Sequence, residues 1–383
     1  MNITYIIGNG FDLGLGLNTT YSDFVRFLSS RIRGWLSTGE KSWDRDERRF
    51  AEWLERKIGE NEYEFWHDAE EAFGELPFSD FRGQEQDLVQ FCHRLFQSEM
   101  AEWIATKNAR FSVPKGERMK IGEKFVDGLL YGWLQGLSED VRSEIENDLM
   151  NGSVGVNILT FNYTDCIEKL LSGIDMPIYE TTGLGAMKRA LHVVPPIHVH
   201  GVVESSGRSA DLVFGVDNER QITGVETSAN DEIVSRLIKE RYLGYTRKRT
   251  EQVAVEVLAN SNWVIILGHS FGKTDGRWWE RIYNDLRIGR YNMVVCPFYA
   301  TMDDAPAYIS DPIRYPRMSA GKVFKSIENM VGNKIYESGF MSHVYAPNPI
   351  DVKAPDGSSN CCDYLNLAWI GKKCIDPIEP LSL

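Results

Sequence analysis

The chain has 383 residues, 43% hydrophobic and 25% charged, which is typical of a globular protein with a substantial core. Its formal net charge of −13 disfavours nucleic acid as a partner, because an acidic surface repels a polyphosphate backbone. No apolar run approaches the ~18 residues of a membrane span and no signal-peptide pattern is present, so we expect a cytoplasmic protein without membrane contact.

The chain order of the predicted elements indicates an interrupted α/β protein. Residues 3–7 form an apolar, β-branched run that predicts a buried parallel strand, followed by a glycine turn. Residues 25–149 carry apolar side chains at helical spacing, and we interpret them as an all-helical insertion. Later strands are predicted at 156–161, 197–200, 212–216, 262–267 and 293–296, with a long helical stretch at about 230–259.

Strands that alternate with helices predict a mainly parallel sheet covered on both faces. We therefore divide the chain into a nucleotide-binding core of residues 1–24 and 150–335, the helical insertion, and a tail of residues 336–383. The tail is weakly patterned, and we interpret it as a capping or partner-binding segment.

The first candidate site is the turn Gly8-Asn9-Gly10-Phe11-Asp12. Glycines after a strand allow bare backbone N–H groups to approach a bound anion. The third glycine of a dinucleotide-binding fingerprint is absent, since Leu13 occupies its place. A tight structural turn explains the pattern equally well.

A second candidate follows the strand at 156–161, where Thr160, Asn162 and Asp165 stand at its predicted carboxyl end. Ligands of open α/β sheets bind outside such ends, and an asparagine can fix a ribose hydroxyl or a water. The alternative is a plain helix cap made by Thr164 or Asp165.

The third candidate is His198-Val199-His200-Gly201. Strand alternation would place both histidines on one face, where they could share a ligand. Without a cysteine or carboxylate at ligand spacing a metal site is disfavoured, and we expect none. A histidine suits general-base chemistry, and Gly201 would admit a ligand closely; the default is a structural histidine.

The fourth candidate is the loop after the strand at 262–267, with Gly268, Ser270 and Asp275 before a predicted helix. Small residues, a hydroxyl and a carboxylate are common in a cofactor-binding loop, although a plain strand-to-helix turn fits as well. Residues 214–218 are a minor candidate that we interpret as a turn.

The order of these motifs resembles the sirtuin-type NAD-binding fold: a glycine loop, T-x-N, H-G and then G-x-S. A closer resemblance is to the AbiH family of phage abortive-infection proteins. It rests on I-G-N-G-F-D-L-G-L-G-L with T-Y-S-D-F, on Trp66 to Glu70, and on T-F-N-Y-T, H-V-H-G and L-G-H-S-F-G.

The resemblance implies a sirtuin-like (Rossmann-like) module that acts in phage defence, with NAD as substrate. Gly8 and Gly10 would face the pyrophosphate, Asn162 would hold the nicotinamide ribose or a water, and His200 would be the general base. Gly268 and Ser270 would line the adenosine half. A phage-derived trigger and a homo-oligomer are the further partners left open.

Three departures from the sirtuin pattern matter. Asp12 replaces a serine, and a carboxylate beside a pyrophosphate is repulsive unless it binds a hydroxyl or a cation. Thr164 replaces an aspartate, with Asp165 one place later. No four-cysteine zinc module follows His200, which argues against protein deacylation and favours cleavage of the nicotinamide–ribose bond.

Three function classes follow. The chain hydrolyses NAD, or it senses a nucleotide without hydrolysis and signals through the insertion. The third is a metal-dependent nuclease or phosphoryl-transfer effector that uses Asp12, Asp165 and Asp275. In the first class we expect the insertion, with Glu70 and Trp66, to control access to a site that is nearly inactive at rest.

Overall fold

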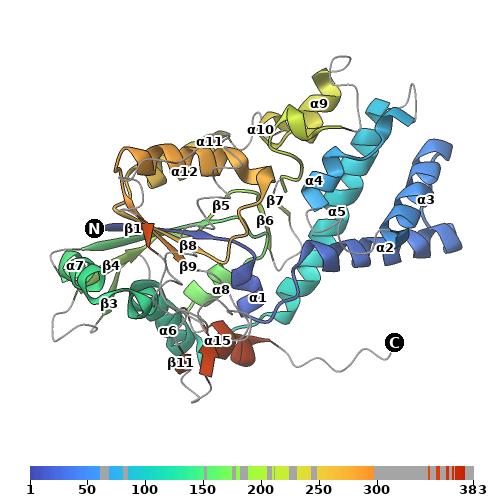
Figure 1. The fold of residues 1–383 in the computed structure, drawn as a ribbon. Helices are drawn as coiled ribbons and strands as arrows, with labels where there is room; N and C mark the ends of the chain where they lie inside the picture. The colour runs from blue at the N-terminus through green and yellow to red at the C-terminus, as the bar shows by residue number, and fades with distance from the viewer. Residues whose placement is uncertain are drawn as a thin grey trace.

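A mainly parallel β-sheet forms the centre of the chain, and helices cover both of its faces (Figure 1). The computed structural model describes residues 1–60, 69–80, 85–150, 153–174, 178–181, 189–204, 209–210, 212–223, 231–242, 248–296, 344–345, 351–353, 359–361, 365 and 367–375. The predicted α/β class is therefore confirmed. No helix within these ranges has the length and apolarity that a membrane crossing needs.

The parallel strands of the sheet run in the order β4-β2-β1-β8-β9-β10. Their bounds are β1 (Asn2–Ile7), β2 (Val154–Thr160), β4 (Arg189–Val193), β8 (Trp263–Leu267), β9 (Asn292–Cys296) and β10 (Val344–Tyr345). Antiparallel β3 (Ile178–Thr181) borders β4, and β5 (Ile197–His198) pairs with the carboxyl end of β2. Numbered along the chain, the parallel strands form the order 3-2-1-4-5-6, which reverses direction between β1 and β8.

Burial of alternate side chains on opposite faces explains why these segments form central strands. On β1, Ile3, Tyr5 and Ile7 join one hydrophobic cluster, whereas Ile6 joins the cluster on the other face. The first face is covered by α1 (Gly10–Gly14), α6 (Arg118–Tyr131), α8 (Cys166–Leu171) and α15 (Leu367–Cys374), and the second by α11 (Lys248–Ala259) and α12 (Gly276–Arg287) (Figure 1).

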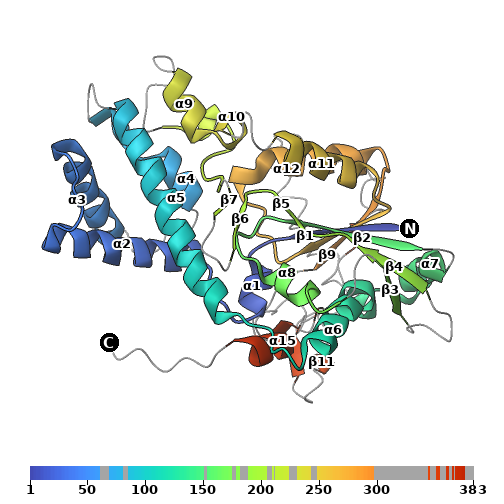
Figure 2. The same ribbon diagram turned by 180° about the vertical axis from the view of Figure 1, so that it is seen from behind.

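A helical arm extends from one side of the sheet (Figure 2). It comprises α2 (Tyr21–Thr38), α3 (Arg45–Glu60), α4 (Ala69–Gly74), η1 (Phe78–Asp80) and α5 (Glu85–Arg110). Thr20 begins α2 by accepting a hydrogen bond from the Asp23 amide, and Gly39 ends it in the left-handed conformation (φ +67°). The arm side chains pack with those of α9 (Asp231–Leu237), and α10 (Lys239–Tyr242) contacts the arm through the ion pair of Lys239 with Glu70.

The helices within residues 25–149 divide between two cores. Those of the arm share one hydrophobic cluster, whereas α6, η2 (Gly132–Gly136) and α7 (Glu139–Met150) place Phe125, Trp133 and Ile145 in the cluster under β1 and β2. In the tail, α15 packs on α1, where Gly371 lies against the Leu15 backbone. The tail also contributes a hairpin of β11 (Asp351–Lys353) and β12 (Ser359–Cys361).

Two predicted elements differ in the structure. The helical stretch at 230–259 is divided into α9, α10 and α11, with 243–247 outside the described residues. The strand predicted at 212–216 is wrong: only Val216 makes a bridge, to Ile238. There the backbone turns at Gly215 (φ +149°), where a Cβ would collide with the Leu237 carbonyl. A hairpin of β6 (Val202–Val203) and β7 (Ser209–Ala210) lies between β5 and this segment.

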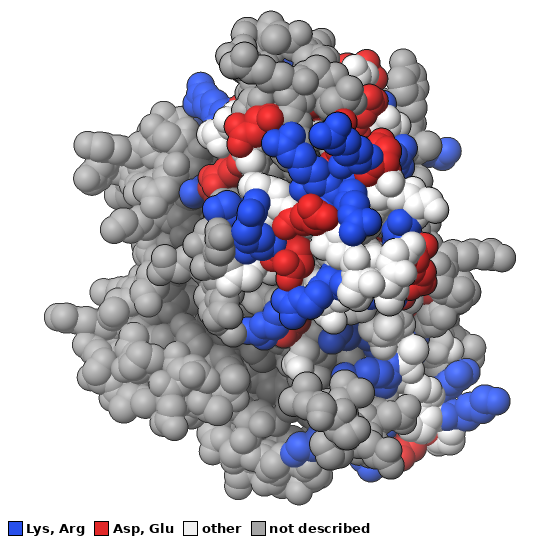
Figure 3. Space-filling model, turned by 90° about the vertical axis from the view of Figure 1, so that its right-hand side faces the viewer, with Lys and Arg blue, Asp and Glu red and all other residues white. Residues whose placement is uncertain are grey.

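The surface on the arm side carries both signs of charge. Over the described part of this face, Figure 3 shows Lys and Arg side chains interleaved with Asp and Glu. Interleaved charges do not produce the one-sign field that attracts a nucleic-acid backbone.

Candidate active site

Three of the predicted loops meet at one edge of the sheet. Ile7 of β1 pairs with Thr160 of β2 on one side and with Leu267 of β8 on the other, all in parallel register. The loops that follow these strands therefore start side by side. The side-chain amide of Asn162 donates to the Gly8 carbonyl at 3.1 Å, which ties the β2 loop to the β1 loop.

The glycine loop after β1 packs directly against the loop after β8. The Gly10 amide donates to the Gly268 carbonyl at 2.8 Å, and the Gly8 amide donates to Leu267 at 3.0 Å. A Cβ on Gly8 would lie 2.7 Å from the His269 Cα, and one on Gly268 (φ +60°) would lie 2.7 Å from the Gly10 Cα. These glycines permit close contact of two backbones, and the amides of Gly8 and Gly10 are already engaged in hydrogen bonds.

The side chain of Asn9 is held within its own loop. Its Oδ1 accepts a hydrogen bond from the Thr19 hydroxyl at 2.6 Å, and its Nδ2 donates to the Thr19 carbonyl at 3.0 Å. Asn9 thus fixes the return of the chain from α1 towards the arm.

Asp12 is fully buried at the start of α1. The Thr164 hydroxyl lies 2.9 and 3.0 Å from its two carboxyl oxygens. Burial raises the pKa of Asp12 to about 7, although hydrogen bonds from Thr164 and Asn162 lower it in part. Asp12 therefore exchanges its proton near neutral pH, inside the fold.

Thr160, Asp165 and His198 hold the loop between β2 and α8. The Thr160 hydroxyl accepts from the Asn162 amide at 3.1 Å, and Asp165 pairs with Lys169 at 2.9 Å. His198 Nδ1 lies 3.0 Å from the Asn162 carbonyl oxygen, and its Nε2 lies 2.6 Å from Glu168. The contacts of these three side chains therefore fix the conformation of this loop.

The two histidines of the H-V-H-G segment separate, and the predicted alternation does not hold. Strand β5 ends at His198, and the chain bends before Gly201, which has φ +98°. His200 instead places Nε2 3.0 Å from Asp275 Oδ1, with its ring edge-on to Phe161 at 5.1 Å. The two histidines thus have different carboxylate neighbours, so they form no joint site.

His200 is buried and neutral. Burial lowers its pKa to about 4, and the charge of Lys239 lowers it further. Its Nε2 has no hydrogen bond of ordinary geometry in the described part of the chain, although Asp275 lies within ion-pair distance. With Nε2 beside a carboxylate, the proton of the neutral ring belongs on Nε2, which leaves Nδ1 as an acceptor.

Behind His200 lies a buried charge cluster of Glu70, Lys239 and Asp275. The Lys239 ammonium donates to Glu70 Oε2 at 2.6 Å, to Asp275 Oδ1 at 3.0 Å and to the Thr274 carbonyl at 3.1 Å. Burial opposes the charge of Lys239, but Asp275 and Glu70 outweigh it and raise its pKa. For Asp275, burial acts to raise the pKa, but Lys239 and His200 together outweigh it and hold the pKa well below its usual range.

The cluster joins three separate parts of the chain. Glu70 comes from α4 of the arm, Lys239 begins α10, and Asp275 comes from η4 (Lys273–Asp275) after β8. Tyr163 extends the cluster, since its hydroxyl lies 3.5 Å from Glu70 and donates to the Val213 carbonyl at 2.9 Å. The arm is thereby connected to His200 through charged groups.

The loop after β8 presents His269 rather than Ser270 to its neighbours. The His269 ring is half-buried, edge-on to Phe161 at 4.9 Å and to Trp279 at 4.6 Å. Its Nδ1 accepts the Phe271 amide at 3.1 Å, and Phe271 has a left-handed backbone (φ 56°). Ser270 is exposed at the tip of this loop.

The described residues contain no group of three or more His, Cys, Asp or Glu side chains that could hold a metal ion. Asp12, Asp165 and Asp275, which the metal-dependent hypothesis brings together, have different partners: Thr164, Lys169 and Lys239.

Sequence reasoning missed Lys239 and His269 as members of this region. Lys239 carries no sequence signal of burial, because it follows only the short apolar pair Leu237-Ile238 and a lysine in such a position is usually exposed. Glu70 was singled out and lies in the cluster, whereas Trp66 lies outside the described residues.

One family model matches the chain over residues 4–296, and its description is bacteriophage abortive infection AbiH. The match spans β1 to β9 and includes every candidate residue named above. No curated protein matches the chain.

Proposed function

Since the match covers more than half of its length, the chain belongs to the AbiH family of bacteriophage abortive-infection proteins, and the family indicates a role in anti-phage defence. We propose that the protein performs this role by hydrolysing NAD at the nicotinamide–ribose bond. The observation that carries the proposal is the buried, net-negative group of His200, Asp275, Lys239 and Glu70 at the carboxyl edge of the sheet.

The strand order supports a dinucleotide as substrate. In open α/β sheets of the order 3-2-1-4-5-6, dinucleotides bind in the crevice where the strand order reverses. Here that point lies between β1 and β8, where Gly8, Gly10 and Gly268 stand. Because the amides of Gly8 and Gly10 are engaged by the β8 segment, the pyrophosphate would run over this joined surface, with Ser270 at its exposed rim.

The charge of the cluster suits the proposed transition state. With both carboxylates ionised, Glu70, Lys239, Asp275 and neutral His200 sum to one negative charge in a low-dielectric setting. Departure of nicotinamide as a neutral leaving group makes the ribose cationic, and a fixed negative charge stabilises that cation.

His200 would act as the general base. Water attacks the ribose carbon as the glycosidic electron pair leaves with nicotinamide, and the water proton goes to His200 Nδ1. The imidazolium so formed is stabilised by Asp275, 3.0 Å from Nε2. Asn162 would hold the ribose or the water, and Gly201 would admit the substrate beside His200.

The described conformation fits a closed resting state. His200 and Asp275 are buried, and Glu70 of the arm holds Lys239 in the cluster. A phage-derived trigger that binds an open arm more tightly than the closed one would shift the population towards activity.

The test is nicotinamide release from NAD by the purified protein, with and without lysate of infected cells. We expect low release alone, higher release with the lysate, and less lysate-stimulated release by Glu70→Ala, because this variant loses one negative charge of the cluster. Glu71→Ala is the matched control, because the adjacent Glu71 pairs with exposed Lys273 outside the cluster.

The lysate-stimulated release should disappear in His200→Ala. If no sample released nicotinamide and His200→Ala protected infected cells as well as the wild type does, hydrolysis would be refuted and nucleotide sensing favoured. Full activity of the unstimulated wild type would refute the closed resting state.

A further inference from the structure

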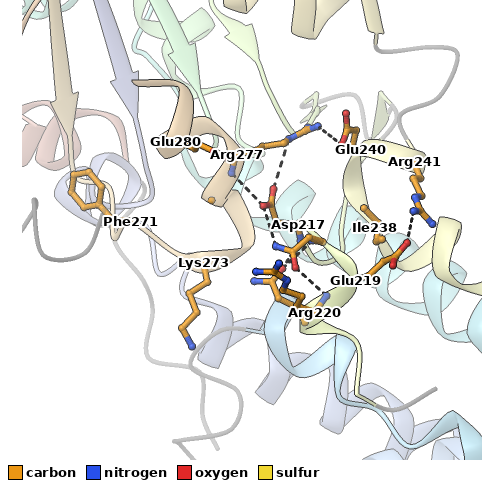
Figure 4. Close-up of a pocket in the computed structure, with 13 residues that line it drawn as sticks. Asp217, Glu219, Arg220, Ile238, Glu240, Arg241, Phe271, Lys273, Arg277 and Glu280 are labelled. Atoms are coloured by element: carbon orange, nitrogen blue, oxygen red, sulfur yellow. Dashed lines mark hydrogen bonds and ion pairs between the residues drawn. The ribbon is translucent and has the colours of Figure 1, made fainter. Parts of the chain in front are cut away.

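A large polar cavity lies outside the candidate active site, between η3 (Glu219–Gln221), α10 and the start of α12 (Figure 4). Its volume is about 960 Å³, within the range of small-molecule sites. Four of its 13 described lining residues are acidic and four are basic. Such a balance suits a small polar ligand better than a polyanion.

Asp217 lies at the centre of this lining in Figure 4. Its side chain is 9% exposed. Oδ2 accepts the Arg277 amide at 3.2 Å, whereas Oδ1 is buried without a hydrogen-bond partner in the described chain. The nearest cation, Arg277 Nε, is 3.8 Å away. A buried carboxylate oxygen beside a cavity is completed by a ligand that donates hydrogen bonds.

The margin of the cavity supplies positive charge. Arg220 is exposed and makes no ion pair within the residues that the structure describes. Lys273 is also largely exposed, and its ammonium contacts Glu71 of the arm at 2.9 Å. A ligand with hydroxyls at Asp217 and an anionic group at this margin would satisfy both ends of the cavity.

The cavity shares its wall with the buried charge cluster. Ile238 and Lys273 line the cavity, while the nearby Lys239 and Asp275 belong to the cluster. Asp217 follows Val216, whose carbonyl accepts the Lys239 amide at 2.9 Å. The cavity therefore lies next to the cluster, where the arm and the sheet are joined.

We propose that this cavity is a second ligand site, for a sugar phosphate of the ribose 5-phosphate class. Two ribose hydroxyls donate to Asp217, and the phosphate contacts Arg220 and Lys273. The site is separate from the proposed NAD site, and its test measures binding alone, so the two proposals fail independently.

The experiment is calorimetric titration of the full chain with ribose 5-phosphate, and separately with ribose and with inorganic phosphate. We expect ribose 5-phosphate to bind more tightly than either fragment. Asp217→Asn should weaken it at least about tenfold, because hydrogen bonds to a charged acceptor are lost. Asparagine still accepts the Arg277 amide, and a thermal melt checks that the variant folds.

Arg220→Ala should weaken ribose 5-phosphate several-fold without changing the affinity for ribose. Glu280→Gln, which alters an exposed acidic lining residue, is the matched control and should leave binding unchanged. Absence of ribose 5-phosphate binding would overturn the proposal. So would binding that inorganic phosphate reproduces and Asp217→Asn does not affect.

Discussion

Replacement of Asp12 by asparagine should make the protein more stable, increasingly so as pH rises. In the folded chain burial raises the pKa of Asp12 from 3.8 to about 7, so the fold retains a proton that the unfolded chain loses. Where the fold binds more protons, raising the pH destabilises it, and the loss is complete above the folded pKa. Asparagine is a neutral substitute that can still accept from the Thr164 hydroxyl.

The size of the effect follows from about 1.4 kcal/mol per pKa unit. The raised pKa of Asp12 destabilises the folded chain relative to the unfolded chain by ~2 kcal/mol at pH 5.5, where Asp12 is still protonated in the fold, and by ~4 kcal/mol at pH 8.5, where it is ionised. Urea unfolding of both proteins at these two pH values should show the advantage of Asp12→Asn growing by ~2 kcal/mol. Because the comparison is between two pH values, any effect of the asparagine amide on stability that does not depend on pH cancels.

The control for Asp12→Asn is Asp87→Asn, which alters an exposed carboxylate on α5 and should give no such growth. Unfolding free energies of Asp12→Asn and the wild type that run parallel from pH 5.5 to 8.5 would show that Asp12 is ionised in the fold. The reasoning from burial would then be refuted.

Two further predictions concern stability. Lys239→Met should cost about 3–5 kcal/mol in urea unfolding, because it leaves buried carboxylates without their cation, whereas Lys273→Met at an exposed pair should cost less than ~1 kcal/mol; equal losses would contradict the burial argument. Gly268→Ala should lower the melting temperature more than Gly39→Ala. Both glycines have left-handed backbones, but Gly39 has open space around it, whereas a Cβ on Gly268 meets the Gly10 Cα at 2.7 Å; similar melting temperatures would mean that the loops separate at little cost.

The strands of the sheet could be predicted from the sequence because a strand that is buried on both faces has a short, nearly continuous apolar sequence. Strands β1, β2 and β8 fall close to the predicted segments, since each buries side chains on both faces. The segment 212–216 has the same composition but is not a strand, because the close approach of Gly215 to Leu237 bends it away. Whether such a segment forms a strand therefore depends on the residues that pack against it in the fold, here Leu237, which the local sequence does not reveal.

The sequence could predict which loops form the candidate site, but it could not predict which side chains contact each other there. Parallel strands bring their carboxyl ends to one edge, so the meeting of the Gly8, Asn162 and Gly268 loops follows from strand order. The pairing of His200 with Asp275 does not, since the two residues lie 75 positions apart in the chain and no sequence pattern connects them. The burial of Lys239 is harder still to predict, because a single lysine after a short apolar pair such as Leu237-Ile238 is usually exposed.

A contribution to the stability of the fold does not by itself explain why the chain has the buried charge cluster. A buried ion pair is commonly no more stabilising than well-packed apolar residues of the same size, because both charges lose their hydration. Here the chain maintains two carboxylates, a lysine and a neutral histidine in one buried region, drawn from the arm, α10 and the loop after β8. Perturbed titratable groups concentrate at functional sites, where their cost in stability is offset by chemistry. The location of this cluster, at the edge of a parallel sheet where ligands of such sheets bind, therefore supports the proposed reaction, which needs a fixed negative charge.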